Sequence, residues 1–240
     1  VDMVDDVGNT ALMRACYFGH HECAQALINS GASVDMVSNN GNTALMHACD
    51  QGHHECAQAL IEAGAAVDMV NNNGDTALMR ACDYGHQEFA QALIFAGAAV
   101  DMVNNRGRTA LMEACINGHH ECAQALLDAQ ADLELTNRGG QNALMVACES
   151  PPSNYSESQR QGKIRCALAI LAATAPIEVT DFPDQAASLK FACDRLQHIE
   201  TVLSSTHVIE DAPHLARVRD LQTDAQDIIV TLAGDMPAIA

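Results

Sequence analysis

The sequence predicts an all-α repeat protein, a solenoid of short stacked units, and three observations lead to this prediction. Thr10, Thr43, Thr76 and Thr109 follow one another at intervals of 33 residues, and neighbouring Leu, Ala and Cys positions keep the same spacing. A fixed period of this length is the signature of repeat architectures. The chain is rich in Ala, Leu, Met and Cys and has only 3 % aromatic residues, which favours small, closely packed helices. Because helices this short are marginal in water, stacking of the copies must supply the core.

Each unit is predicted to be a helical hairpin, as residues 38–70 illustrate. Thr43 is suited to cap the start of a short helix over ALMHACD, and Gly52 supplies the left-handed residue that ends it. Apolar residues then recur at three- and four-residue spacing along a second helix, which ends at Gly64. The Asn-, Asp- and Gly-rich stretch at 65–75 predicts a β-hairpin-like finger loop that projects outward and leads into the next unit.

This register divides the whole chain into segments. They are the end of a preceding unit at 1–4, four full units at 5–37, 38–70, 71–103 and 104–136, a fifth unit at 137–181 with an insertion loop at about 149–161, a degenerate sixth unit at 182–211, and a C-terminal capping helix and tail at 212–240. Because VDMV at 1–4 repeats the ending of later units, we expect a further unit, and further function, upstream of Val1.

The insertion in the fifth unit separates ALMVAC at 143–148 from GKIRCALAIL at 162–171 by eleven extra residues. It is polar, begins with two prolines and is predicted to be an exposed loop between the two helices of the unit. A neutral surface expansion is the simplest interpretation. A partner-specific contact, or a modified Ser or Tyr, is the alternative.

The repeated motif closely resembles that of a known family. GNTALMHACDQGHHECAQALIEAGAAVDMV at 41–70 is similar to the ankyrin-repeat pattern G-x-T-P-L-H-x-A-A-x-x-G-H-x-E, and the resemblance covers four units and the start of a fifth. It implies a solenoid of helix-turn-helix units that binds other proteins. The family's Pro and His are replaced here, by Ala44 and Met46 in the second unit, so the usual Thr-to-His hydrogen bond is absent. Because Ala favours helix and Met packs adaptably, we expect the fold to survive.

The charge and hydropathy of the chain limit its partners. A net charge of −19 would repel nucleic acids and anionic membrane surfaces, so we expect a neutral or basic protein or peptide instead. No run of about 18 apolar residues predicts a membrane span. Ten cysteines fall at helical core spacing without a preceding signal peptide, which indicates a reducing compartment, the cytoplasm or alternatively the nucleus.

The Cys and His residues do not predict chemistry. Cys16 and Cys23, like Cys49 and Cys56, are expected on facing helices of one hairpin, where core thiols are favoured over disulfides. The repeated Gly-His-His-Glu-Cys offers metal-ligand types, but consecutive helical residues diverge by about 100° and cannot converge on one ion. These features recur in several units, whereas an active site is singular, so we expect no enzyme activity, no metal and no cofactor.

Positions that differ between units are the candidates for recognition. The resemblance implies that the pair before each helix-ending Gly faces a concave groove, and the finger tips vary as well, as does the helix position of Arg14, His47, Arg80, Glu113 and Val146. The predicted partner-binding residues are Tyr17, Phe18, Asp50, Gln51, Asp75, Asp83, Tyr84, Arg106, Arg108, Ile116 and Asn117. Exposed aromatic residues commonly anchor interfaces. The alternatives are packing between units for the aromatic residues and a solvated face for the charges.

The leading hypothesis is therefore a monomeric scaffold or adaptor module that binds a partner through its concave groove and finger tips. A second hypothesis makes the array the targeting arm of a larger enzyme or secreted effector whose catalytic part lies upstream. A third makes it a structural element that packs on its own chain or on copies of itself.

Overall fold

The computed structural model describes residues 1–149 and 155–173, and within them it contains ten α-helices and no β-strand. The helices are α1 (Ala11–Tyr17), α2 (His21–Asn29), α3 (Ala44–Gln51), α4 (His54–Glu62), α5 (Ala77–Tyr84), α6 (Gln87–Phe95), α7 (Ala110–Asn117), α8 (His120–Asp128), α9 (Ala143–Cys148) and α10 (Glu157–Ala173). The all-helical repeat prediction is confirmed. The predicted sixth unit at 182–211 and the capping helix at 212–240 lie outside the described residues.

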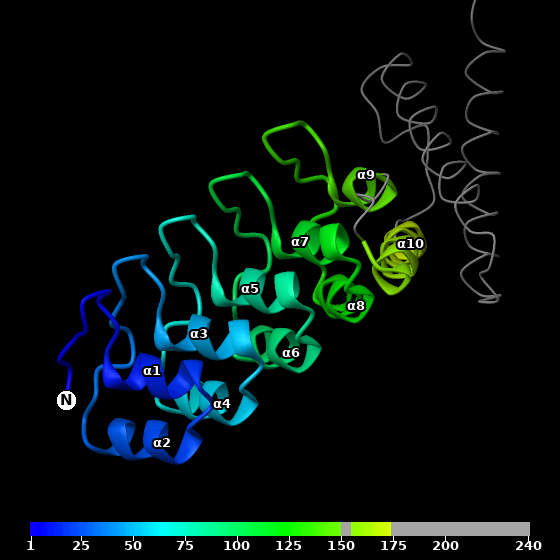
Figure 1. The fold of residues 1–240 in the computed structure, drawn as a ribbon. Coiled ribbons are helices and arrows are strands. Elements are labelled where there is room, and N and C mark those ends of the chain that lie inside the picture. Colours follow the sequence, from blue (N-terminus) through cyan, green and yellow to red (C-terminus); the bar gives the residue numbers. More distant parts are fainter. Residues whose placement is uncertain (150–154, 174–240) are drawn as a thin grey trace, which may run out of the picture.

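The helices form two parallel rows (Figure 1). The first helices of the units, α1, α3, α5, α7 and α9, make up the first-helix row, and α2, α4, α6, α8 and α10 make up the second-helix row. Each helix packs against its partner in the same unit and against its counterpart in the next unit. The finger loops all project to one side, next to the first-helix row (Figure 1).

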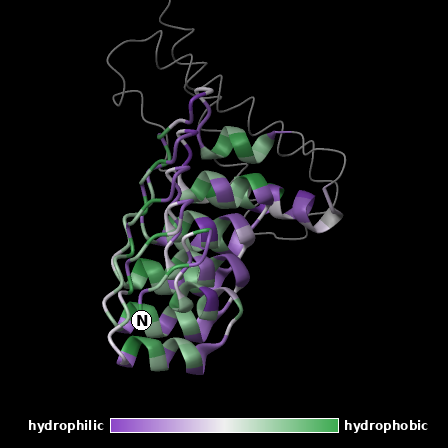
Figure 2. Ribbon diagram, turned by 60° about the vertical axis from the view of Figure 1, so that its left-hand side comes forward, coloured by the Kyte–Doolittle hydropathy of each residue, from purple (hydrophilic) through white to green (hydrophobic). Residues whose placement is uncertain are grey.

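One hydrophobic core runs through all the units. In the second unit, Leu45, Met46, Ala48 and Cys49 are each at most 1 % exposed, and their equivalents are buried in the other full units. Hydrophobic segments recur at the same place in successive helices of the stack (Figure 2). The Met that replaces the family's His is thus a core residue, which agrees with the expectation that the fold tolerates it.

Each first helix begins at a side-chain cap. The hydroxyl oxygens of Thr10, Thr43, Thr76 and Thr109 accept a hydrogen bond from the main-chain N–H three residues later, at 3.2–3.3 Å. Asn142 takes the same role in the fifth unit. This bond satisfies an otherwise unpaired N–H of the first helical turn and confirms the predicted helix start.

The finger loops are joined to one another by a ladder of asparagine side chains. The amides of Asn39, Asn72 and Asn105 each donate to a main-chain oxygen in the preceding finger, from Asp6, Asn39 and Asn72 respectively. The donors and acceptors are 33 residues apart. Consecutive fingers are therefore held in register by the repeat period itself.

A second ladder of carboxylates lies at the other end of the loops. Asp2, Asp35, Asp68 and Asp101 each accept a hydrogen bond from a main-chain N–H 31 residues later, at 2.8–3.0 Å. Such charge-assisted bonds are stronger than neutral ones. These four aspartates thus have a structural role in joining the units.

Some buried cysteines lie beside a cysteine of the neighbouring unit. Burial raises the pKa of Cys16 of the first unit and Cys56 of the second unit adds to this effect, while Cys23 of the first unit is exposed. Cys16 on α1 and Cys23 on α2 do lie on the two packed helices of one hairpin, as expected, but only Cys16 is a core residue. The nine cysteines of the described residues are free thiols, and seven of them are buried.

The insertion in the fifth unit differs from its prediction. Helix α10 begins at Glu157, so the part of the predicted loop at 157–161 is helical and the prediction is wrong there. Ser156 and Gln159 form a reciprocal capping box that starts this helix. The Nζ of Lys163, which is 5 % exposed, donates to the carbonyl of Val146 at 2.9 Å and so satisfies an acceptor of α9.

Two glycines of the third unit have left-handed backbone but different surroundings. Gly85 ends α5 with φ of +77°, and a Cβ placed on it would clash with the ring Nδ1 of His119 in the next unit. Gly97 has φ of +88° but nothing within 4 Å of such a Cβ. A comparison of substitutions at Gly85 and Gly97 therefore distinguishes the cost of backbone strain from the cost of a clash between units.

We expect Gly85→Ala to lower the free energy of unfolding more than Gly97→Ala. Both variants incur the left-handed strain of roughly 1–2 kcal/mol, and only Gly85→Ala adds a clash with His119. Urea denaturation followed by circular dichroism measures the difference. The second substitution His119→Ala should recover part of the loss in Gly85→Ala and none in Gly97→Ala, and equal losses in the two single variants would contradict this account.

Candidate interaction face

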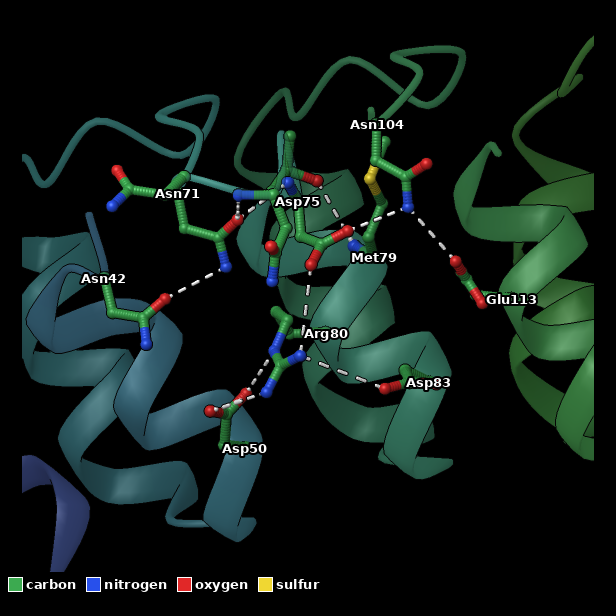
Figure 3. A network of polar contacts seen from close by, with 12 residues as sticks. Asn42, Asp50, Asn71, Asp75, Met79, Arg80, Asp83, Asn104 and Glu113 are labelled. Atoms are coloured by element: carbon green, nitrogen blue, oxygen red, sulfur yellow. Dashed lines mark hydrogen bonds and ion pairs between the residues drawn. The ribbon is translucent and has the colours of Figure 1, made fainter. Parts of the chain in front are cut away.

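The surface next to the finger loops carries most of the residues that vary between units. We call it the inner face, and it is formed by the exposed or half-buried side chains of the first helices and finger bases. Its residues are Arg14, Tyr17, Phe18, His47, Asp50, Gln51, Asp75, Arg80, Asp83, Tyr84, Arg108 and Asn117. Figure 3 shows its centre, where Arg80 extends from α5 between Asp50 of α3 and Asp75 of the finger base.

Arg80 is the hub of a network that joins two units. Its Nε and Nη2 donate to the two carboxylate oxygens of Asp50 at 2.7 and 3.0 Å, a bidentate pair between α5 and α3. Asp75 and Asp83 each have an oxygen 4.0 Å from Nη1. The hydrogen bond to Asp50 is the main cause of the raised pKa of Arg80. Since the Asp50 side chain is only 9 % exposed, its carboxylate is already paired within the chain.

A second network surrounds Glu113, which is 6 % exposed. Asn104 donates to one carboxylate oxygen at 3.1 Å, and Arg108 approaches the other at 3.4 Å. Burial is the main cause of the raised pKa of Glu113, with Arg108 opposing it. At the end of the same helix, the side chain of Asn117 donates to Asp83 at 2.8 Å and so links α7 to α5 on the inner face.

Two aromatic stacks stand on the inner face. The guanidinium of Arg14 lies 5.3 Å from the ring centroid of Phe18, and the His20 ring stacks on the same residue at 6.2 Å. Two units further on, Arg80 lies 5.1 Å from the Tyr84 ring, and the His86 ring stacks at 6.3 Å. Despite these neighbours Phe18 is 52 % and Tyr84 47 % exposed.

Tyr17 belongs partly to the contact between units. Its ring meets Phe18 edge-on at 5.1 Å and His47 of the second unit at 5.7 Å, and the residue is 39 % exposed. Burial lowers the pKa of His47, as its largest cause, and both ring nitrogens are buried without a hydrogen-bond partner among the described residues. Part of the Tyr17 ring is therefore used in packing between units, which was the alternative to partner binding, whereas Phe18 and Tyr84 are more exposed than Tyr17.

The other predicted contact residues are distributed unevenly. Gln51 is exposed at the end of α3, Arg106 is exposed at a finger tip, and Ile116 is half-buried against the core. Asp50, Asp75, Asp83 and Tyr84 gather around Arg80, while Arg106 has no part in that network.

Sequence reasoning named Arg80 and Glu113 only as variable positions and missed their roles as hubs. The Asp50 to Arg80 spacing of 30 residues, close to one period, was the available signal.

The part of the chain that the structure describes contains no cluster of three or more His, Cys, Asp or Glu able to hold a metal ion. No helix in that part has the length and hydropathy of a membrane span. Burial raises the pKa of the Cys16 and Cys49 thiols, and raises that of Cys148 to about 12. These thiols are therefore protonated at neutral pH, which makes them poor nucleophiles.

Cys23 should be the thiol that reacts first. It is exposed on α2, whereas Cys16, Cys49 and Cys56 are at most 1 % exposed. In a chain carrying Cys193→Ser, we expect one fast equivalent in a native titration with a chromogenic disulfide reagent, and its disappearance in Cys23→Ser. A fast phase that survives Cys23→Ser would show that a buried thiol is accessible.

Glu113 should make stability depend on pH. Its folded-state pKa lies above its ordinary value of 4.5, so its contribution to stability is fully present below pH 4.5 and is lost as pH rises through the folded pKa. We expect the free energy of unfolding of Glu113→Gln, relative to the parent chain, to increase between pH 4 and pH 7 in urea denaturation. Glu55→Gln at an exposed position of α4 is the control. A relative stability that falls or stays level over this range would contradict the assignment.

Comparison with known families adds one match. A family model described as ankyrin repeats, in three copies, matches residues 12–102 and again residues 91–181. The two matches together span residues 12–181, which is well over half of the 240 residues. No curated protein sequence matches the chain.

Proposed function

The chain belongs to the ankyrin-repeat family, whose arrays are generally protein–protein interaction modules, and from this premise we propose that it binds a partner protein or peptide through its inner face and finger tips. The family match alone gives the class of function. The particular surface is inferred from the side chains that the stack leaves exposed.

The observation that carries this proposal is the exposure of three aromatic residues on one face. Tyr17, Phe18 and Tyr84 are 39–52 % exposed, although the described chain has few other aromatic side chains. Large rings that remain in water have apolar area available to a partner, and aromatic residues dominate interface energies. All three occupy positions that differ between the units, whereas the buried Leu, Ala and Cys positions repeat.

The charges of the inner face favour a neutral or basic partner. Asp50, Asp75 and Asp83 surround the single guanidinium of Arg80, which leaves this part of the face negative. The chain as a whole carries −19, so long-range electrostatics would steer a basic segment toward it and oppose a nucleic acid. Arg106 and Arg108 on the fourth finger supply a separate cationic end for an acidic group of the partner.

The proposed setting is a reducing compartment, the cytoplasm or alternatively the nucleus, in which the chain acts as a monomer. The nine cysteines of the described residues are free thiols, most of them in the core, which supports this setting because disulfides are rare in such compartments. The proposal requires no cofactor and no chemistry from this chain.

The test is affinity capture from cell lysate with the full chain and with the triple variant Tyr17→Ala, Phe18→Ala, Tyr84→Ala. We expect the triple variant to lose the captured partner, because the loss of exposed hot-spot side chains commonly costs more than 1 kcal/mol each. Phe95→Ala is the matched control, since Phe95 is 94 % exposed at the end of α6 in the second-helix row.

Circular dichroism must first show that all variants fold equally. Equal capture by the parent and the triple variant would rule out the inner face as the binding surface. A loss of capture in Phe95→Ala alone would move the site to the second-helix row.

A further inference from the structure

The two aromatic stacks of the inner face are copies of one arrangement. Arg14, Phe18 and His20 of the first unit correspond to Arg80, Tyr84 and His86 of the third, each 66 residues or two periods later. In the units between and after them the ring position holds an amide instead, Gln51 in the second and Asn117 in the fourth. The inner face therefore alternates between ring and amide along the stack.

Both rings are held in place before any partner arrives. Each has a guanidinium over it and an imidazole stacked on it, and the Tyr84 hydroxyl also accepts a hydrogen bond from Arg80 at 3.2 Å. A side chain fixed in this way loses little rotamer freedom on binding. Rigid, amphipathic aromatic residues of this kind make effective contact points for a partner.

The two amides differ in availability. Asn117 donates to Asp83 and to the main-chain oxygen of Glu113, so its N–H groups are occupied. Gln51 is exposed, and its side chain makes no hydrogen bond within the described part of the chain. It lies one unit from each ring and can both donate to and accept from the main chain of a bound segment.

The distance between the rings follows from the packing of the helices. Neighbouring packed helices lie about 8–10 Å apart, so α1 and α5, with α3 between them, are separated by about 16–20 Å. An extended chain advances about 3.3 Å per residue. Two side chains that reach Phe18 and Tyr84 from one extended segment are therefore about five or six residues apart.

The two ends of this surface differ in charge. Arg14 makes no ion pair within 4.0 Å among the described residues, so the Phe18 end is positively charged and would repel a Lys or Arg of the peptide. The exposed Phe18 ring at this end offers apolar area to an uncharged, apolar side chain. Beside Tyr84, the Asp83 side chain is 36 % exposed, and the oxygen not bonded to Asn117 is 4.0 Å from Arg80. This oxygen accepts no hydrogen bond within the described part of the chain and has only the long ion pair with Arg80, so it can accept one from a Lys or Arg of the peptide.

We infer that Phe18, Gln51 and Tyr84 form one docking strip for an extended, basic peptide segment of the partner. An apolar side chain of the peptide contacts Phe18, its main chain pairs with the Gln51 amide, and a Lys or Arg five or six residues away binds Asp83 beside Tyr84. This inference rests on the proposed function and specifies the chemistry of the partner.

The first stage of the test identifies ligands without a known partner. Random 12-residue peptides displayed on phage are selected on the full chain at physiological salt. Enriched peptides should share an apolar residue and a Lys or Arg separated by five or six positions. Recovery of no enriched peptide, or of peptides without this spacing, overturns the inference.

The second stage measures binding of the most enriched peptide, labelled with fluorescein, by fluorescence anisotropy. We expect at least a fivefold rise in Kd for Phe18→Ala, for Gln51→Ala and for Asp83→Asn. Phe95→Ala and Asp128→Asn, at exposed ends of second helices, should change Kd less than twofold. Insertion of three residues between the two peptide anchors should weaken binding at least fivefold. Unchanged affinity in these strip variants or in the lengthened peptide overturns the inference.

A double-mutant cycle tests the ion pair directly. Replacing the peptide's Lys or Arg by Gln should weaken binding to the parent chain but have little further effect on Asp83→Asn. Additive losses overturn the assignment of the cation to Asp83. Failure of the strip leaves the lysate capture and its aromatic dependence intact, whereas failure of the capture experiment rejects the proposed function itself.

Discussion

The stacking of each helical hairpin on its neighbours is the interaction on which the rest of this structure depends. A pair of helices of seven to nine residues has too little internal hydrogen bonding to persist alone, and each helix packs against its counterpart in the next unit as well as against its partner in the same unit. In the stack, Leu45 and Met46 are at most 1 % exposed. The core is therefore a property of neighbouring pairs, and stability accumulates along the stack.

The polar contacts between units also repeat along the stack. Because every unit is displaced from the preceding one by the same step, a hydrogen bond between two neighbouring units recurs between the next two units. The Asn72 to Asn39 bond and the Asp68 to Ala99 bond are each one rung of such a ladder. The glycine turns obey the same constraint, since Gly85 must leave room for His119 of the following unit. A scaffold held together in this way leaves the inner face free to differ between copies.

The proposed function depends on this variation of the inner face between units. The inner-face position that is Arg in the first and third units is His47 in the second and Glu113 in the fourth, and each exchange builds a different local network. Arg80 forms ion pairs with three aspartates. Glu113 accepts hydrogen bonds from Asn104 and Arg108. The inner face therefore carries aromatic, amide and charged side chains in an order that differs from unit to unit, whereas the supporting core residues repeat. Recognition by an extended surface needs this combination of rigid support and local variety.

The sequence by itself determined the fold class, the register of the units, the helix caps at Thr43 and Gly52, and the set of positions that vary, because all of these follow from periodicity and local backbone preference. It could not determine which variable residues find partners within the chain. Asp50 and Gln51 are adjacent and polar, yet Arg80 from the next unit takes the carboxylate and leaves the amide in solvent. The same limit explains why the helical part of the insertion was predicted wrongly, because Gly162 of α10 packs against Gly118 across the boundary between units. The neighbourhood of Cys16 and Cys56 likewise arises only when the units stack. Contacts between residues about one period apart depend on how hairpins stack in three dimensions, and only the tertiary structure decides them.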